Sequence, residues 1–130
     1  MPVKFFISID ASEKETYEKL RRGASWGILC ENMNFVSELR KNNAIERLQL
    51  NFVIQNENYN QMENFIELGR QWNVDEIIFQ EITNLGTFTD EEFKKINIAA
   101  KENLHYQELV NIMSRILNST KDISIKQGIL

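Results

Sequence analysis

The chain has 130 residues, 42% of them hydrophobic, which is enough for one domain with a buried core. Its 19 acidic and 15 basic residues are scattered without long runs of one sign, so nucleic acid is not expected as a main partner. No stretch approaches the roughly 20 apolar residues that cross a bilayer, and the single cysteine cannot form an internal disulfide, so we expect a cytoplasmic protein without a membrane segment.

The N-terminal segment predicts a strand followed by a short helix. Residues 3–10 are rich in β-branched and aromatic residues and become polar at their end, as strands do. Ser12 and Glu15 have the spacing of a capping box, in which the serine accepts from a backbone amide and the glutamate reaches back. We therefore expect a helix to begin there and to direct Tyr17 and Leu20 inward.

A longer helix is expected next. Gly23 can end the first helix, and Ser25 can cap the second. The Asn-Asn pair at 42–43 is expected to end it. Its apolar residues recur at helical spacing along one face, and they are Leu29, Met33, Val36 and Leu39.

The order of strand and helix is repeated in the middle of the chain. Residues 48–55 alternate between apolar and polar side chains, which predicts a second strand, and Asn58 is expected to cap the helix that follows. Residues 75–82 have the composition of a third strand. Between these strands one helical stripe contains Met62, Phe65, Ile66, Gly69 and Trp72.

The C-terminal part is expected to be mainly helical over residues 90–118. Thr89 and Glu92 repeat the capping-box spacing and predict a helix start. A short strand is expected at residues 123–125. The clearest helical periodicity of the chain joins Leu109, Ile112, Met113 and Ile116.

Strands separated by helices favour parallel pairing through right-handed crossovers, so the predicted fold class is α/β, with parallel strands alternating with helices. No Pro- or Gly-rich linker divides residues 1–130, which we take as a single domain. The sequence contains no GxGxxG, Walker A, GxSxG or HExxH pattern, so nucleotide-phosphate, serine-hydrolase and zinc-protease functions are not indicated.

The first two predicted strands have one apolar and one half-polar face. A polar face near the C-terminal ends of parallel strands is typical of the inside of a ligand-binding barrel. The alternative is a sheet with helices on one side and water on the other, and the pattern leaves both interpretations open. The third strand alternates less clearly. The apolar faces contain Phe5, Ile7 and Ile9 in the first strand and Leu48, Leu50, Phe52 and Ile54 in the second.

Individual residues allow structural as well as functional interpretations. Cys30 lies in a predicted helix, where a lone cysteine most often packs as a small apolar residue. His105 has no cysteine or acidic cluster at metal-ligand spacing, so a position at the surface or at a helix start is expected. Asp10 can serve either as a helix cap or as a ligand contact. Trp26 and Trp72 are expected to pack helices on the sheet.

Residues 7–11, Ile-Ser-Ile-Asp-Ala, are followed by residues 15–23, Glu-Thr-Tyr-Glu-Lys-Leu-Arg-Arg-Gly. This pair resembles the fourth strand and following helix of radical S-adenosylmethionine enzymes, especially those with a C-terminal SPASM or twitch extension. The resemblance extends over about residues 3–117 in matching order and spacing. Its later parts, which resemble the fifth strand, the sixth strand and the segment after it, are residues 50–55 with Asn58, 74–80 and 85–89.

The resemblance implies a partial TIM-type barrel, of which this chain has about three to four βα units, with S-adenosylmethionine bound across the strand ends. It implies that Ser8 and Asp10 lie beside the methionine or ribose part of the cofactor. It also implies that Arg21 or Arg22 pairs with the cofactor's carboxylate, since guanidinium groups suit carboxylates. Four further positions are implied: Asn51 and Gln55 facing the barrel interior, and Phe79 and Gln80 near the adenine.

The chain departs from the family in the part that carries the chemistry. The family's hallmark is a CxxxCxxC loop whose three thiolates bind a 4Fe-4S cluster, whereas this chain has only Cys30. The family's first three βα units are also missing. We therefore expect a C-terminal fragment, a truncated gene product or an excised piece of such an enzyme, which is not catalytically competent alone.

Two functional hypotheses follow. In the first, the chain carries part of the cofactor- and substrate-side wall of a radical S-adenosylmethionine barrel, and its partner is the missing N-terminal half. In the second, it is a stand-alone α/β interaction module that binds a partner through its exposed sheet face and edges. Because open strand edges invite pairing with another chain, self-association is expected under either hypothesis.

Overall fold

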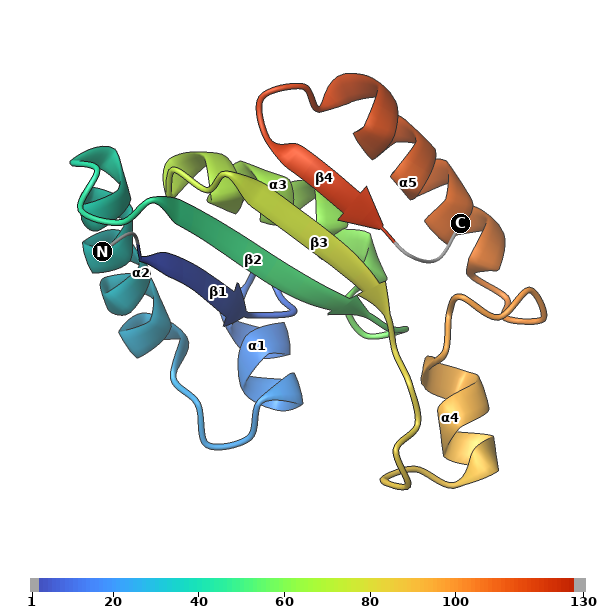
Figure 1. Ribbon diagram of the computed structural model, residues 1–130. Helices are drawn as coiled ribbons and strands as arrows, with labels where there is room; N and C mark the ends of the chain where they lie inside the picture. Colours follow the sequence, from blue (N-terminus) through green and yellow to red (C-terminus); the bar gives the residue numbers. More distant parts are fainter. Residues whose placement is uncertain (1–2, 128–130) are drawn as a thin grey trace.

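The computed structural model describes residues 3–127, and within them four parallel strands form a single sheet (Figure 1). Neighbouring strands are separated by helices in the chain, as parallel pairing requires. The expected α/β class, with parallel strands alternating with helices, is confirmed. In sequence order, which is also their order in the sheet, the strands are β1 (Lys4–Ser8), β2 (Arg47–Ile54), β3 (Glu76–Glu81) and β4 (Ser124–Gln127).

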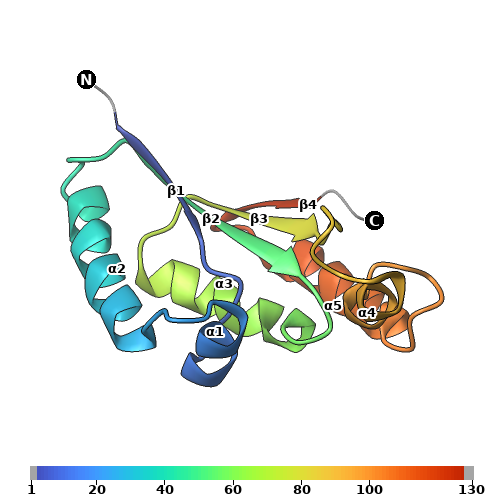
Figure 2. The same cartoon turned by 90° about the horizontal axis from the view of Figure 1, so that it is seen from below.

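The helices cover one side of this sheet. Figure 2 shows α1, α2, α3 and α5 on the same side of the four strands. In Figure 1, α4 lies beyond the C-terminal ends of the strands. The helical elements are α1 (Lys14–Leu20), α2 (Trp26–Lys41), the 3-10 turn η1 (Tyr59–Gln61), α3 (Met62–Gln71), α4 (Asp90–Ile96) and α5 (Tyr106–Ser119).

The core lies between the sheet and these helices. Phe52 of β2 is at its centre, with its ring 4.9 Å from that of Phe65 in α3 and 5.4 Å from that of Phe79 in β3. Both pairs meet edge to face, a favourable geometry for aromatic rings. The predicted apolar face of β2 is confirmed, since Leu48, Leu50, Phe52 and Ile54 are all buried. The predicted stripes of α3 and α5 are likewise buried.

Two of the predicted helix starts are confirmed. The side chain of Ser25 accepts a hydrogen bond from the backbone N–H of Ile28 and caps α2. Thr89 and Glu92 form a reciprocal capping box at the start of α4, with bonds of 3.1 Å and 3.0 Å. Each motif satisfies backbone N–H groups that a helix start leaves unpaired.

The capping box predicted at Ser12 is wrong. Helix α1 begins at Lys14, and no side chain caps it. Ser12 instead donates its backbone N–H and its hydroxyl to Oε1 of Gln61, at 2.8 Å and 3.2 Å. Because Gln61 follows 49 residues later, this tertiary contact replaces the local motif that the spacing suggested.

The carboxylate of Asp75 connects the N-terminal ends of two neighbouring strands to a helix. Asp75 accepts two hydrogen bonds from the guanidinium of Arg40, at 2.7 Å and 2.8 Å, and one from the backbone N–H of Leu48 at 2.8 Å. These bonds connect the end of α2 to the N-terminal ends of β2 and β3. The Arg40 hydrogen bonds, more than any other cause, hold the pKa of Asp75 below its usual value.

The C-terminal part follows the prediction in outline. The expected strand at residues 123–125 is present as β4, displaced by one to two residues. Helix α4 contains no fully buried residue. A search of residues 3–127 finds no helix long and apolar enough to cross a membrane.

Candidate functional site

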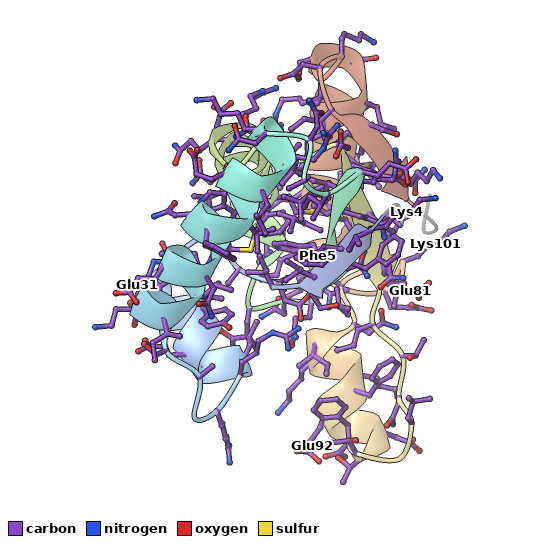
Figure 3. All side chains as sticks on the ribbon, turned by 60° about the vertical axis from the view of Figure 1, so that its left-hand side comes forward. Lys4, Phe5, Glu31, Glu81, Glu92 and Lys101 are labelled. Atoms are coloured by element: carbon purple, nitrogen blue, oxygen red, sulfur yellow. The ribbon has the colours of Figure 1, made fainter. Side chains whose placement is uncertain are left out.

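We call the side of the sheet that carries no helix the open face. In Figure 3, Lys4 and Phe5, which are neighbours in β1, point to opposite sides of the strand. This alternation continues through the sheet, because successive side chains of a strand point to opposite faces. The open face therefore contains Lys4, Phe6, Ser8, Arg47, Gln49, Asn51, Val53, Glu76, Ile78, Gln80, Ser124 and Lys126.

Three of the predicted cofactor-binding residues lie on the open face near the C-terminal ends of the strands. Ser8 of β1 is directly opposite Asn51 of β2, and Gln80 of β3 is opposite Val53. The side-chain amide of Gln49 donates to Oδ1 of Asn51 at 2.9 Å, which orients the Asn51 side chain. The hydroxyl and two amides offer donors and acceptors to a polar ligand.

Asp10 lies just after β1, and both oxygens of its carboxylate accept hydrogen bonds within the protein. Its backbone has a positive φ of 66°, a conformation that aspartate tolerates better than most residues. Oδ1 accepts from the backbone N–H of Val53 at 2.7 Å, and Oδ2 accepts from Arg21 at 2.8 Å. Asp10 does not cap α1, because the residue before that helix is Glu13.

Arg21 is held in the same network. Besides the bond to Asp10, its Nε donates to the backbone carbonyl of Ile9 at 3.3 Å. The guanidinium thus pairs with a carboxylate of the protein itself. The resemblance implied that it would pair with the carboxylate of the cofactor. Its neighbour Arg22 is exposed in the turn after α1.

Asn58 completes the connection between β1 and β2. It is fully buried, and Nδ2 donates to the carbonyls of Asp10 and Val53 at 2.9 Å and 2.8 Å. Its Oδ1 accepts from the backbone N–H of Gln55 at 2.8 Å. Asn58 precedes η1, as the prediction of a cap required, but its side chain joins strand ends and does not cap that turn.

The other two predicted positions lie in different surroundings. Phe79 points into the core and is 0% exposed, because residues of β3 alternate and Phe79 shares the helix-covered face with Ile77. It is therefore not available on the open face beside Gln80. Gln55 is half-buried directly after β2.

An ionic row crosses the N-terminal half of the open face. Glu76 of β3 is 2% exposed although no helix covers this face, because it lies between Arg47 of β2 and Lys126 of β4. The Nζ of Lys126 is 3.1 Å from the carboxylate. Lys4 is opposite Arg47 in the strand register. This row was not predicted from the sequence, where its only signal was the charge at alternate positions of predicted strands.

The residues present do not fit a 4Fe-4S cluster. Such a cluster needs several thiolates, and the one cysteine of the chain, Cys30, packs half-buried against the core. Burial raises the pKa of its thiol, which disfavours the thiolate that binds iron. Among residues 3–127 no group of three His, Cys, Asp or Glu side chains is placed to hold a metal ion. The interpretation of Cys30 as a packing residue agrees with this placement.

Comparison with known proteins adds no family assignment. A scan against protein-family models finds no match, and a search of curated proteins finds no significant relative. The resemblance to radical S-adenosylmethionine enzymes therefore stays a hypothesis. What the structure establishes is a parallel α/β sheet with one helix-covered face and one half-polar open face.

Proposed function

We propose that the chain forms part of the wall of a ligand-binding βα barrel of the radical S-adenosylmethionine type, with its open face turned toward S-adenosylmethionine. One observation carries this proposal: four parallel strands lie in sequence order, helices cover one side, and the other side is half-polar. Consecutive βα units of a barrel have this arrangement, and their ligands lie at the C-terminal ends of the strands.

Ser8, Asn51 and Gln80 are the proposed contacts. They lie on the open face near the ends of three neighbouring strands, where they can exchange hydrogen bonds with the hydroxyl groups and ring nitrogens of the cofactor. Asp10 and Arg21 act as positioning residues, because both oxygens of Asp10 are used in holding β1 against β2 and Arg21. The proposed contacts are thus fewer than the cofactor-binding residues that the resemblance implied.

The wall alone is not proposed to cleave the cofactor. Reductive cleavage in this family requires a 4Fe-4S cluster, and this chain has one cysteine. The cluster would have to come from a complementary N-terminal half of the barrel. This chain would then supply the hydrogen bonds that orient the cofactor. Its partner would supply the electron for the reductive cleavage of the cofactor.

Calorimetric titration with S-adenosylmethionine tests the proposal. We expect binding that is weakened about tenfold by Asn51→Ala, which corresponds to the loss of one well-formed hydrogen bond. Asn34→Ala is the matched control, because Asn34 is exposed on α2, away from the open face. Absence of binding, or equal weakening by both substitutions, would contradict the proposed role of the open face.

A second candidate function is a stand-alone interaction module. It is favoured by the edge strand β1, whose Phe6 is 60% exposed on the open face. Val3, the residue just before this strand, is 41% exposed. Unpaired edges with exposed apolar side chains favour pairing with another chain. Sedimentation at micromolar concentration should then show a complex that Phe6→Ser weakens, and a strictly monomeric particle would argue against this candidate.

A further inference from the structure

Strand β1 forms one edge of the sheet, and its outer side has no partner strand within residues 3–127 (Figure 1). The carbonyl of Val3 accepts from the N–H of Glu46 at 2.7 Å, and the N–H of Ile9 donates to the carbonyl of Asn51 at 3.2 Å, so residues 3 and 9 face β2. Because the backbone groups of successive strand residues point in opposite directions, those of residues 5 and 7 also face β2. The N–H and C=O groups of residues 4, 6 and 8 therefore point away from the sheet.

Apolar surface is incompletely covered at the same edge. Leu48 and Leu50 of β2 are fully buried, whereas Phe5 and Ile7, which lie opposite them in β1, are only half-buried. On the open face, Phe6 is exposed. A further strand beside β1 would therefore bury apolar side chains on both faces of the sheet.

The ionic row of the open face is unbalanced at this edge. Arg47 and Lys126 both pair with the buried carboxylate of Glu76. Lys4 lies beside Arg47 in the register, and no ion pair within residues 3–127 includes it. Since like charges on adjacent strands repel, a carboxylate on the outer side of Lys4 would be favourable.

Strand β3 shows the kind of strand that would fit beside β1. Its successive open-face positions carry an acid, an apolar residue and an amide, which are Glu76, Ile78 and Gln80. In parallel alignment such a strand places its acid beside Lys4 and its apolar residue beside Phe6. Residues 4–8 of β1 contain no acid, so pairing β1 with β1 of a second copy would not supply the carboxylate.

We infer that the β1 edge binds an extended segment of a partner protein as a parallel strand. The segment would carry a carboxylate beside Lys4 and an apolar residue, two positions further on, beside Phe6. Its backbone would pair with the outward groups of residues 4, 6 and 8, so that main-chain bonds give affinity and alternate side chains give specificity. The inference rests on the interaction module of the second candidate function and names the chemistry of its partner.

The probe is a synthetic peptide with blocked ends and the sequence of residues 75–81, Asp-Glu-Ile-Ile-Phe-Gln-Glu, which has the required pattern. It is added to the whole ¹⁵N-labelled chain up to about 10 mM, a range suited to weak binding, while amide hydrogen exchange is followed. We expect exchange to slow about fivefold or more at Lys4, Phe6 and Ser8. Exchange at Phe5 and Ile7 should not change, because their N–H groups already face β2.

An exchange of charges tests the acid beside Lys4. A second peptide, with lysine in place of the glutamate at position two, should bind the unsubstituted chain about fivefold more weakly. The substitution Lys4→Glu should reverse this preference. Lys121→Gln is the matched control and should leave it unchanged, because Lys121 is exposed and precedes β4 at the other edge of the sheet.

Phe6→Pro tests the backbone contact. It removes an outward N–H and leaves the bonds to β2 in place, as edge strands allow, so the slowing at Lys4 and Ser8 should be lost. The inference is overturned if the first peptide slows no exchange along β1, if both peptides bind the unsubstituted chain equally, or if Phe6→Pro binds the first peptide unchanged. Self-association that persists in any of these cases would leave the second candidate function standing, and titration with S-adenosylmethionine tests the open face independently.

Discussion

At the scale of single residues, Asp10 joins three parts of the structure through its carboxylate and its backbone carbonyl. It hydrogen-bonds the backbone of Val53 in β2 and the side chain of Arg21 after α1, while its own carbonyl accepts from Asn58. The polar character of a strand end is visible in the sequence. Its partner 43 residues later is not, because periodicity describes neighbours on one element and not contacts between elements.

Arg21→Ala should lower the free energy of unfolding by about 1–2 kcal/mol, because it leaves the mostly buried carboxylate of Asp10 without its cation. Arg22→Ala is the matched control and should change it by less than about 0.5 kcal/mol, since Arg22 is exposed. Urea unfolding followed by circular dichroism measures both values. Equal effects of the two substitutions would show that the bond between Arg21 and Asp10 is not the stabilising one.

At the scale of elements, local signals predicted most of the helices and strands. The caps at Ser25 and Thr89 and the buried face of β2 follow from spacing alone. The cap at Ser12 failed because Gln61 competes for its donors. The resemblance implied that Phe79 lies near the ligand. The sequence pattern could not correct this, because both sides of β3 carry apolar residues and the alternation does not reveal which side faces the core.

The bonds around Asp75 predict how stability depends on pH. Arg40 lowers the pKa of Asp75 in the folded state, so this carboxylate stabilises the fold above its unfolded pKa of about 4. That contribution is lost as the pH falls through the lower folded value. Asp75→Asn keeps an acceptor for Leu48 but has no charge to lose.

We therefore expect the free energy of unfolding to fall less between pH 6 and pH 3 in Asp75→Asn than in the unsubstituted chain, by about 1 kcal/mol. Urea unfolding at a series of pH values measures the difference. Glu91→Gln is the control, because Glu91 is exposed in α4 and should leave the slope unchanged. An unchanged slope in Asp75→Asn would mean that the pairing with Arg40 does not stabilise the fold.

At the scale of the whole molecule, the sheet has two unlike faces. Sequence patterning predicted parallel strands and a half-polar side, but it could not decide between a barrel interior and a face open to water. The choice between the two depends on what packs against the open face, and no helix within residues 3–127 does so. The ionic row around Glu76 shows that the chain can bury a charge on this face without a helix above it.

Whether the open face binds S-adenosylmethionine can be measured by mapping chemical-shift changes on the ¹⁵N-labelled chain as the cofactor is added. We expect the largest changes at Ser8, Asn51 and Gln80, on three neighbouring strands of the open face, and none along α2 on the covered side. No change at a saturating concentration, or changes confined to the helix-covered side, would contradict the claim that the open face is a wall of the cofactor site.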